Sequence, residues 1–467
     1  MKGFWQRFGV IAALALLVRL VSLPLYPLMD TTEARYGNMA RIMAETGNWL
    51  TPMFDYGVPF WGKPPLHTWA SAAGIELFGV NELAVRLPHF LAALLTLALM
   101  AWFARKLAVS ASATVMVLST TVVFSIAAGA VMTDMLLTLG LTLAMVGFYC
   151  GWHGSKGWSY AGFAGLAIGL LAKGPLVIVL MGLALLPWLV WQHGLFRGVQ
   201  QLWQRLPLLS GLGLMLLLTA PWYWLAEQAT PGFLQYFLVG EHFLRFVDSG
   251  WQGDLYGSAH DQTRGTIWIY FMLAALPWSP LLLWLGWRHR RGTMSDWQAL
   301  ALCWMLAPML LFTLAGNILP AYVLPGIPAM ALLIAAALTP ARQRWFGKVA
   351  LTTPLLLVIA IAVLWLQTAE ERSDKALLSH RSAELVDVTP LYYFDEVTFS
   401  GQFYSAGKAQ LLPTEPRALA ALPAKPFYLV GRNRQLDRLP RSLTDNCSTV
   451  KIGSRRSLLL CGEVATP

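Results

Sequence analysis

The stretch VIAALALLVRLVSLPLYPLMDTTEARYGNMARIMAETGNW, residues 10–49, joins a long apolar run to a segment rich in charge. The apolar part is long enough to cross the hydrocarbon core of a bilayer as a helix. Directly after it come five charged residues, Asp30, Glu33, Arg35, Arg41 and Glu45. Because ionisable groups at a membrane boundary are costly unless they are used, this pattern indicates a membrane protein with polar chemistry where its first helix ends.

The composition of the whole chain extends this interpretation. Of 467 residues, 57% are hydrophobic and only 12% are charged, about half the charged fraction of a typical soluble domain. We therefore predict an all-α multi-pass membrane protein with about eleven transmembrane helices, rather than a soluble chain with a very large core. The predicted spans are 8–28, 86–104, 109–128, 134–152, 158–172, 175–191, 206–226, 264–287, 298–314, 319–338 and 348–366.

The distribution of positive charge predicts the orientation. The net charge of +10 does not indicate nucleic-acid binding, because the basic residues lie in short loops between spans. Lys2 and Arg7 precede the first span, and alternation of the spans places the basic loops at 105–106, 156 and 197–205 on the same side. This is the positive-inside pattern of a multi-pass membrane protein whose N-terminus lies on the cytoplasmic side. The first span lacks a clear cleavage site, so we expect an uncleaved helix rather than a signal peptide.

Three segments are then expected on the outer, periplasmic side: the loops 29–85 and 227–263 and the tail 367–467. We predict a catalytic transmembrane domain over 1–366 and a small α/β or β-rich soluble domain over 367–467, because the tail alternates strand-like and turn-like pieces. Cys447 and Cys461 lie in this tail and are either a disulfide in an oxidising compartment or two buried thiols. Cys150 and Cys303 lie in apolar segments and are expected in the core.

The segment 31–47 has the pattern of an amphipathic helix, with a threonine at its start and Gly47 at its end. We expect this helix to lie at the outer membrane surface, with its apolar stripe in lipid or protein. Asp30 and Glu33 fall at its N-terminal end, where a carboxylate is either a helix-capping group or part of a site.

Further ionisable residues fall on the same predicted side. Lys63 precedes two prolines, which fix the direction of the local backbone. The others are Asp134, Lys173, Glu241, His242, Arg245, His260 and Tyr322. Each has an ordinary structural explanation: Lys173 can extend its amine to the interface, Asp134 can cap a helix, and His242 can be a hydrogen-bonded histidine. Their convergence on one face instead favours a site that binds an anion and moves a proton.

Six motifs occur in an order that resembles the GT-C membrane glycosyltransferases. They are TEARY at 32–36, KPPLHTW at 63–69, MTDMLLT at 132–138, LAKGP at 171–175, EHFLRF at 241–246 and YVLPGIPAMALL at 322–333. The set is most similar to the bacterial lipid A aminoarabinose transferases, and it also resembles the protein O-mannosyltransferases. The resemblance implies a helical bundle with interfacial helices in the first outer loop. It also implies inverting transfer of a sugar from a polyprenyl phosphate, such as undecaprenyl phosphate, to lipid A, lipopolysaccharide or another envelope glycan.

The resemblance also implies roles for the candidate residues. A lipid phosphate leaving group needs positive charge, which Lys63, Arg35 and Arg245 supply with the Tyr322 hydroxyl. The acceptor needs a carboxylate, for which Asp30 is the first candidate and Glu33 the second, while Asp134 orients the acceptor or the first loop. Tyr36, His242 and Lys173 are supporting residues.

Two departures from the aminoarabinose transferases matter. There the acid pair is adjacent, whereas here Thr32 precedes Glu33 and the other acid is Asp30, two residues earlier. The residue before the turn lysine is often Glu in that family and is Gly62 here, so we expect no bound metal and no other cofactor.

Two other functions are weighed beside this one. A protein O-glycosyltransferase would use the same chemistry on a protein acceptor. A flippase or transporter of a lipid-linked sugar would show charges near the middle of the membrane and a repeated architecture. The polar residues gather at one interface and the sequence shows no internal repeat, so an enzyme is favoured over a transporter.

Overall fold

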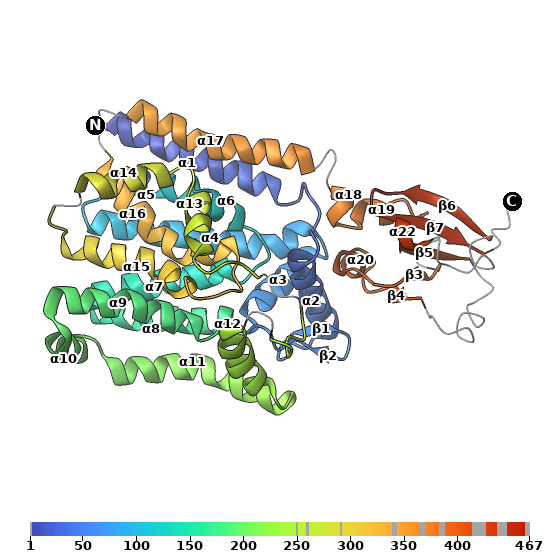
Figure 1. Cartoon of the computed structure of the whole chain (residues 1–467), viewed down its shortest axis with the longest axis horizontal. Coiled ribbons are helices and arrows are strands. Elements are labelled where there is room, and N and C mark those ends of the chain that lie inside the picture. The colour runs from blue at the N-terminus through green and yellow to red at the C-terminus, as the bar shows by residue number, and fades with distance from the viewer. Residues whose placement is uncertain are drawn as a thin grey trace.

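The computed structural model describes residues 2–248, 251–257, 261–289, 292–338, 343–364, 369–382, 388–412, 426–436 and 446–462. A bundle of helices forms the larger part and a small sheet domain forms the smaller part, at opposite ends of the longest axis (Figure 1). Elements of the first loop, α2 and α3, lie between the two parts.

Among the described residues, six helical segments are long and apolar enough to cross a membrane, and a bent pair raises this to seven. The six are α4 (Glu82–Lys106), α7 (Asp134–Trp152), α9 (Leu176–His193), α11 (Leu208–Ala229), η2 with α16 (Pro320–Gly326 and Ile327–Ala337) and α17 (Gln343–Val363). The remaining bundle helices are α1 (Lys2–Ser22), α5 (Ala111–Ser119), α6 (Val122–Ala127), α8 (Lys156–Lys173), α10 (Leu195–Arg205) and α15 (Asp296–Phe312). The structure thus supports a multi-pass helical architecture, with helices at the positions that the apolar runs predict.

Two predicted single spans are each divided in the structure. The run 264–287 forms α13 (Thr266–Ala274) and α14 (Ser279–His289), which are bent by 107°. The run 109–128 is divided between α5 and α6 at Thr120 and Thr121. There the Trp278 indole donates to Thr120 Oγ1 at 3.1 Å, and the Thr353 hydroxyl donates to the Thr120 carbonyl at 2.6 Å. The Thr353 hydroxyl thus binds a carbonyl that a continuous helix would bond internally, and the Val122 N–H donates to the Leu276 carbonyl at 2.9 Å.

Glycine residues bring α7 and α8 into backbone contact. A Cβ atom on Gly140 would lie 2.7 Å from the Gly165 carbonyl oxygen, and one on Gly147 would lie 2.5 Å from the Gly162 nitrogen. Larger side chains at these positions would force the helices apart, as at other close helix crossings in membrane proteins. This close approach sets the start of α7 beside the end of α8.

The first loop is compact. It contains α2 (Thr32–Thr46), the short antiparallel pair β1 (Met53–Asp55) and β2 (Val58–Pro59), and α3 (Leu66–Phe78). The predicted helix at 31–47 is confirmed, and it ends at Gly47 with a left-handed φ of 65°. Its apolar stripe is buried within the protein, because Ala34, Met39 and Ile42 are 0% exposed. The second loop forms the π-helix η1 (Gln235–Leu244) and the short helix α12 (Arg245–Val247).

The C-terminal part contains a five-stranded mixed sheet in the order β4-β3-β5-β7-β6. The strands are β3 (Leu391–Tyr393), β4 (Ala409–Leu411), β5 (Phe427–Arg432), β6 (Cys447–Ile452) and β7 (Arg456–Cys461). The short helices are α18 (Ala369–Arg372), α19 (Lys375–Leu378), α20 (Phe399–Tyr404) and α22 (Asn433–Leu436). β3 pairs in parallel with β4 and β5, whereas β7 pairs antiparallel with β5 and β6.

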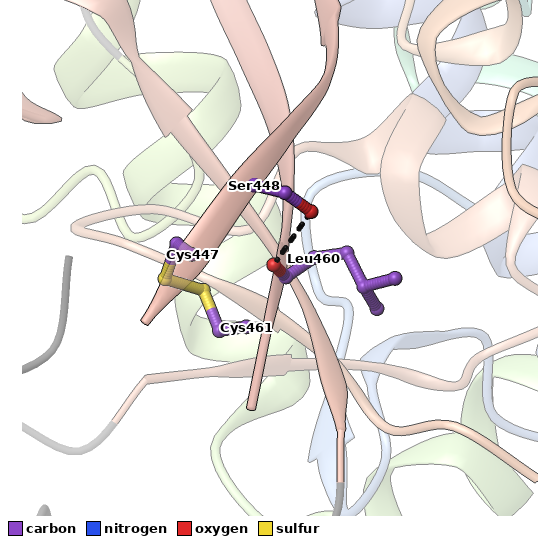
Figure 2. The surroundings of a disulfide bond; sticks show 4 residues. All are labelled: Cys447, Ser448, Leu460 and Cys461. Carbon is purple, nitrogen blue, oxygen red and sulfur yellow. Dashed lines mark hydrogen bonds between the residues drawn. A yellow bond between two sulfur atoms is a disulfide. The ribbon is translucent and has the colours of Figure 1, made fainter. Parts of the chain in front are cut away.

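The two C-terminal cysteines form a disulfide between β6 and β7. Cys447 and Cys461 are directly paired in the register of these strands, next to the pair Ser448 and Leu460 (Figure 2). Of the two alternatives for these cysteines, the structure selects the disulfide. Cys150 and Cys303 are free and buried, as predicted.

Candidate active site

Two cations from different loops share one carboxylate. Lys63 Nζ lies 2.9 Å from Glu241 Oε2, and Arg245 Nη1 lies 3.0 Å from Glu241 Oε1. The other side of the Arg245 guanidinium lies 3.0 Å from Asp254 Oδ2. We call these four residues the cation cluster.

Local sequence explains why these side chains meet. Lys63 follows β2 and precedes Pro64 and Pro65, so its backbone is restricted, and its ammonium also donates to the Gly62 carbonyl at 2.5 Å. Glu241 lies in η1, and Arg245, four residues later, begins α12, which continues directly from η1. Burial acts to raise the pKa of Glu241, but Lys63 and Arg245 hold that pKa below its ordinary value. The carboxylate is therefore ionised and holds both cations in place.

A second ion pair lies where α7 begins and α8 ends. Asp134 Oδ1 accepts a hydrogen bond from Lys173 Nζ at 2.7 Å, and the two side chains are 5% and 8% exposed. The same ammonium lies 4.3 Å from the centre of the Tyr322 ring, which η2 supplies. Lys173 is thus enclosed by a carboxylate and an aromatic face, an arrangement that favours its charged form.

His242 connects the two groups. It follows Glu241 in the chain, and its Nε2 lies 3.2 Å from the Lys173 carbonyl oxygen, while its Nδ1 lies 2.8 Å from that of Phe237. Burial lowers the pKa of His242, so the imidazole is neutral and donates to only one of these carbonyls. The cation cluster and the Asp134–Lys173 pair are therefore neighbours.

Arg35 and Tyr36 on α2 face the same region. Arg35 Nη1 donates to the Tyr256 carbonyl at 2.6 Å, and the guanidinium carbon lies 5.1 Å from the Tyr36 ring centre. The Tyr36 ring packs edge-on against His67 at 4.6 Å. Burial, together with the positive charges of Lys63 and Arg35, lowers the pKa of His67 to about 3. His67 is therefore a neutral packing residue between α2 and α3.

The structure gives Glu33 a different set of partners. Both of its oxygens accept from Arg86, at 2.9 and 2.7 Å. Burial raises the pKa of Glu33, but the Arg86 charge and hydrogen bonds hold it below the ordinary value. Arg86 also donates to three backbone carbonyls of the α1–α2 connection, those of Leu23, Tyr26 and Pro27. Glu33 thus helps to fix the start of the first loop.

Asp30 also turns away from the cation cluster. One of its oxygens accepts from the Ser400 backbone N–H at 3.0 Å and the other from the Ser400 hydroxyl, both in α20 of the C-terminal part. Burial raises the pKa of Asp30 to about 6, partly opposed by these hydrogen bonds. In the described part of the chain, neither Asp30 nor Glu33 contacts Lys63, Arg245 or Lys173.

The remaining predictions are placed as follows. Sequence reasoning gave no role to Glu241, although its spacing of four from Arg245 is a signal for a helical ion pair. It also missed Asp254, Arg86 and Ser400, whose partners are distant in the chain. His260 lies outside the described residues. Within those residues, no group of three or more histidine, cysteine, aspartate or glutamate side chains is arranged to hold a metal ion.

Comparisons with known sequences find similarity to two kinds of glycosyl-transferring protein. Residues 7–237 match the dolichyl-phosphate-mannose-protein mannosyltransferase family. The undecaprenyl phosphate-alpha-4-amino-4-deoxy-L-arabinose arabinosyl transferase of Edwardsiella ictaluri is 31% identical over 342 residues, covering 70% of this chain and 58% of the relative. The enzyme of the same name from Aeromonas hydrophila is 31% identical over 358 residues, covering 72% of this chain and 62% of the relative. The chain therefore spans less than two thirds of the length of these relatives.

Comparisons with solved structures extend over almost the whole chain. The crystal structure of ArnT from Cupriavidus metallidurans bound to undecaprenyl phosphate has a TM-score of 0.76 at 20% identity, with 98% of each chain covered. The oligosaccharyltransferase of Archaeoglobus fulgidus has a TM-score of 0.51 at 11% identity, covering 92% of this chain and 70% of the other. At these identities the likeness establishes a shared fold.

Proposed function

We propose that this chain is a membrane glycosyltransferase of the GT-C type that transfers a sugar from a polyprenyl phosphate to an acceptor of the bacterial cell envelope, as its similarity to the proteins above supports. The observation that carries the proposal is the cation cluster. Lys63 and Arg245 come from different loops and converge on one point, beside a second buried carboxylate, Asp134. Such an arrangement suits a phosphate leaving group and an acceptor that must lose a proton.

The donor we propose is undecaprenyl phosphate carrying 4-amino-4-deoxy-L-arabinose, and the acceptor is lipid A. The names of the curated relatives support this donor, and the structural neighbour was crystallised with undecaprenyl phosphate. A lipid-linked donor is also consistent with a site near the ends of apolar helices, because the polyprenyl tail can remain in the membrane while the phosphate reaches the cations.

For the phosphate we propose contacts with Lys63, Arg245 and Arg35, with the Tyr322 hydroxyl as a further donor. Glu241 holds Lys63 and Arg245 about 3 Å from its oxygens before the donor binds. A phosphate at this place would share the two cations with Glu241 through charge-assisted hydrogen bonds. As the bond to the sugar breaks, negative charge grows on the phosphate, and these positive groups stabilise it.

For the proton we propose Asp134 as the acceptor, because its partner Lys173 adjoins His242 and so the cation cluster, whereas Asp30 and Glu33 bind Ser400 and Arg86. The acceptor oxygen attacks the anomeric carbon, the bond from that carbon to the phosphate oxygen breaks, and the polyprenyl phosphate leaves with the bonding electrons. The proton of the attacking group passes to the Asp134 carboxylate. A single displacement of this kind inverts the configuration of the sugar. Lys173, Tyr36 and His242 keep the carboxylate and the loops in position.

We place the protein in the bacterial inner membrane with its N-terminus in the cytoplasm. The proposed division is a catalytic domain over 1–366 and a periplasmic domain over 367–467. The Cys447–Cys461 disulfide supports a periplasmic C-terminal domain, because that compartment is oxidising. A second candidate function, transfer to a protein, is favoured by the match of residues 7–237 to protein mannosyltransferases.

Mass spectrometry of envelope lipids tests the proposal in cells that contain the wild-type protein, Asp134→Asn or no protein. Loss of an aminopentose-sized mass from lipid A in both deficient strains is the expected result. Unchanged lipids with loss of a protein-linked sugar would instead support the protein acceptor. If donor accumulates only without the protein, and Asp134→Asn behaves as wild type, the transferase proposal is overturned in favour of a transporter.

A further inference from the structure

The C-terminal domain is fastened to the first loop through a buried carboxylate. Ser400, at 0% exposure, directs both its backbone N–H and its hydroxyl to Asp30. The Ser400 hydroxyl oxygen in turn accepts from the Asp374 backbone N–H at 3.0 Å. On the other side, the Asp30 backbone N–H donates to the Arg372 carbonyl at 2.7 Å. Asp30, which precedes the first turn of α2, is therefore bound to two separate segments of the C-terminal domain.

A second set of bonds lies next to this one. The Tyr404 hydroxyl accepts from the Leu28 backbone N–H at 2.7 Å and donates to Glu82 Oε1 at 2.8 Å. Lys375 Nζ lies 2.5 Å from the same Glu82 oxygen. These contacts connect α19 and α20 to the start of α4, and they fix the chain just before Asp30. We call the Asp30–Ser400 and Glu82–Tyr404 contacts together the docking contact.

The docking contact and the candidate active site are joined by the buried cluster around α2. Phe403 of α20 packs with the buried α2 residues, and a Cβ on Gly37 would lie 3.7 Å from its ring. Arg35 and Tyr36 instead contact Tyr256 and His67. The helix α2 thus contacts both the C-terminal domain and the candidate site, so we expect a displacement of α20 to displace α2.

We propose that Asp30 is a positioning residue that couples the C-terminal domain to the active site through α2. Its carboxylate binds Ser400 and so holds α20 in contact with α2. This contact keeps Arg35 and Tyr36 of α2 in position relative to Lys63. The part of this inference that concerns activity rests on the proposed transferase function. The part that concerns docking stands on the contacts alone, so the two are tested by separate measurements.

The activity test compares three variants in the full-length protein. Asp30→Ala removes both hydrogen bonds to Ser400, and Ser400→Ala removes the one from the hydroxyl. We expect transfer rates to fall about tenfold or more in Asp30→Ala and by a smaller factor in Ser400→Ala, with a raised KM for the donor. Asp30→Asn keeps an oxygen for the Ser400 N–H and an amide for its hydroxyl, so we expect activity within about threefold of wild type. A carboxylate that takes part in proton transfer would lose activity equally as Asn and as Ala, and that result overturns the proposal.

The matched control is Ser457→Ala. Ser457 is also buried in the C-terminal domain, but its hydroxyl donates to Asn433 at 2.8 Å within that domain. We expect this variant to keep both activity and docking. The double variant Asp30→Ala/Ser400→Ala should be no worse than Asp30→Ala alone, because Asp30→Ala already removes both bonds to Ser400. Fully additive losses would contradict the coupling.

Hydrogen exchange of the purified protein tests docking without any enzyme assay. In Asp30→Ala we expect faster exchange at fixed pH in α2 and α20, while β5 and β7 remain protected. Unchanged exchange in α2 and α20 overturns the docking role whether or not the wild-type protein transfers a sugar. If exchange changes as expected but the wild type shows no transfer, the docking stands and the proposed function fails.

Discussion

Arg86 binds Glu33 through both carboxylate oxygens, at 2.9 and 2.7 Å, and its remaining N–H groups donate to the carbonyls of Leu23, Tyr26 and Pro27. All five donors of a fully buried guanidinium are therefore used. The charge that follows the first apolar helix thus has a structural purpose as well as a chemical one. It closes the turn between α1 and α2 and so sets the place of Arg35.

Arg86→Ala should destabilise the protein strongly. The change leaves Glu33 and three carbonyls without their partner, and loss of one member of a buried ion pair costs about 3–5 kcal/mol. Thermal unfolding in detergent, followed by size-exclusion chromatography, should show a large drop in Tm. Glu33→Gln keeps the size and one acceptor oxygen, so its Tm should fall less. A Tm for Arg86→Ala equal to wild type would contradict this role.

Asp134→Asn should remove transfer while leaving donor binding intact. The amide cannot accept the proton from the acceptor group, and loss of a general base lowers rates by about 100-fold or more. An Asn oxygen can still accept from Lys173, so the affinity for polyprenyl phosphate should stay within about threefold. The assay is single-turnover transfer with the purified protein, paired with a direct binding measurement. Normal turnover in this variant would remove Asp134 as the proton acceptor.

The docking contact should depend on pH. Burial raises the pKa of Asp30 to about 6 from 3.8, with Ser400, Asp374 and Arg456 as its neighbouring polar groups. A raised pKa means that the docked state binds the proton more tightly than the undocked state. Docking should therefore strengthen as pH falls from about 7 to about 4, by on the order of 1–3 kcal/mol.

Limited proteolysis of the full-length protein at pH 5 and pH 7.5, with a protease active at both, measures this dependence. Cleavage near α20, corrected for protease activity, should be slower at pH 5. Asp30→Asn has no such ionisation, so its pH dependence should be smaller. The same dependence in wild type and Asp30→Asn would assign the effect to another group.

The disulfide should stabilise the C-terminal sheet. Cys447 and Cys461 are separated by 14 residues, and closing a loop of that length contributes about 3 kcal/mol in the chain-entropy description. Cys447→Ser/Cys461→Ser should make β6 and β7 exchange hydrogen faster without changing exchange in α7 and α8. Cys150→Ser, which changes a buried free thiol in the helical part, is the matched control. Equal protection of the sheet in the double variant and wild type would contradict the expected contribution.

Much of the architecture could be predicted from local patterns. Apolar runs marked most helices of the bundle, and the spacing of apolar residues marked α2. Asp134 and Lys173 were singled out at predicted ends of spans, and Lys63 and Arg245 in the two outer loops; the structure places these four residues near one another. These predictions worked because helical periodicity and membrane thickness act over short stretches of sequence.

Partners that are far apart in the sequence could not be predicted in this way. Asp30 and Ser400 are 370 residues apart, and Arg86 is 53 residues from Glu33. Nothing in the pattern around Asp30 distinguishes a carboxylate that faces a substrate from one that faces another domain. The division at Thr120 involves hydrogen bonds from residues distant in the sequence, which also leave no local signature, whereas Pro277 marks the break between α13 and α14.

The central claim is that Lys63 and Arg245 hold the phosphate of a lipid-linked donor. The most direct test is the affinity of the purified protein, in lipid nanodiscs, for a polyprenyl phosphate without sugar. Lys63→Ala should raise the Kd about tenfold or more, since one charge-assisted contact is lost. The control is Lys156→Ala, which also removes one lysine charge. Lys156 lies at the start of α8, whereas Lys173, near the cation cluster, lies at its end. This control should leave the Kd within about twofold. An unchanged Kd for Lys63→Ala, or an equal loss in both variants, would contradict the account.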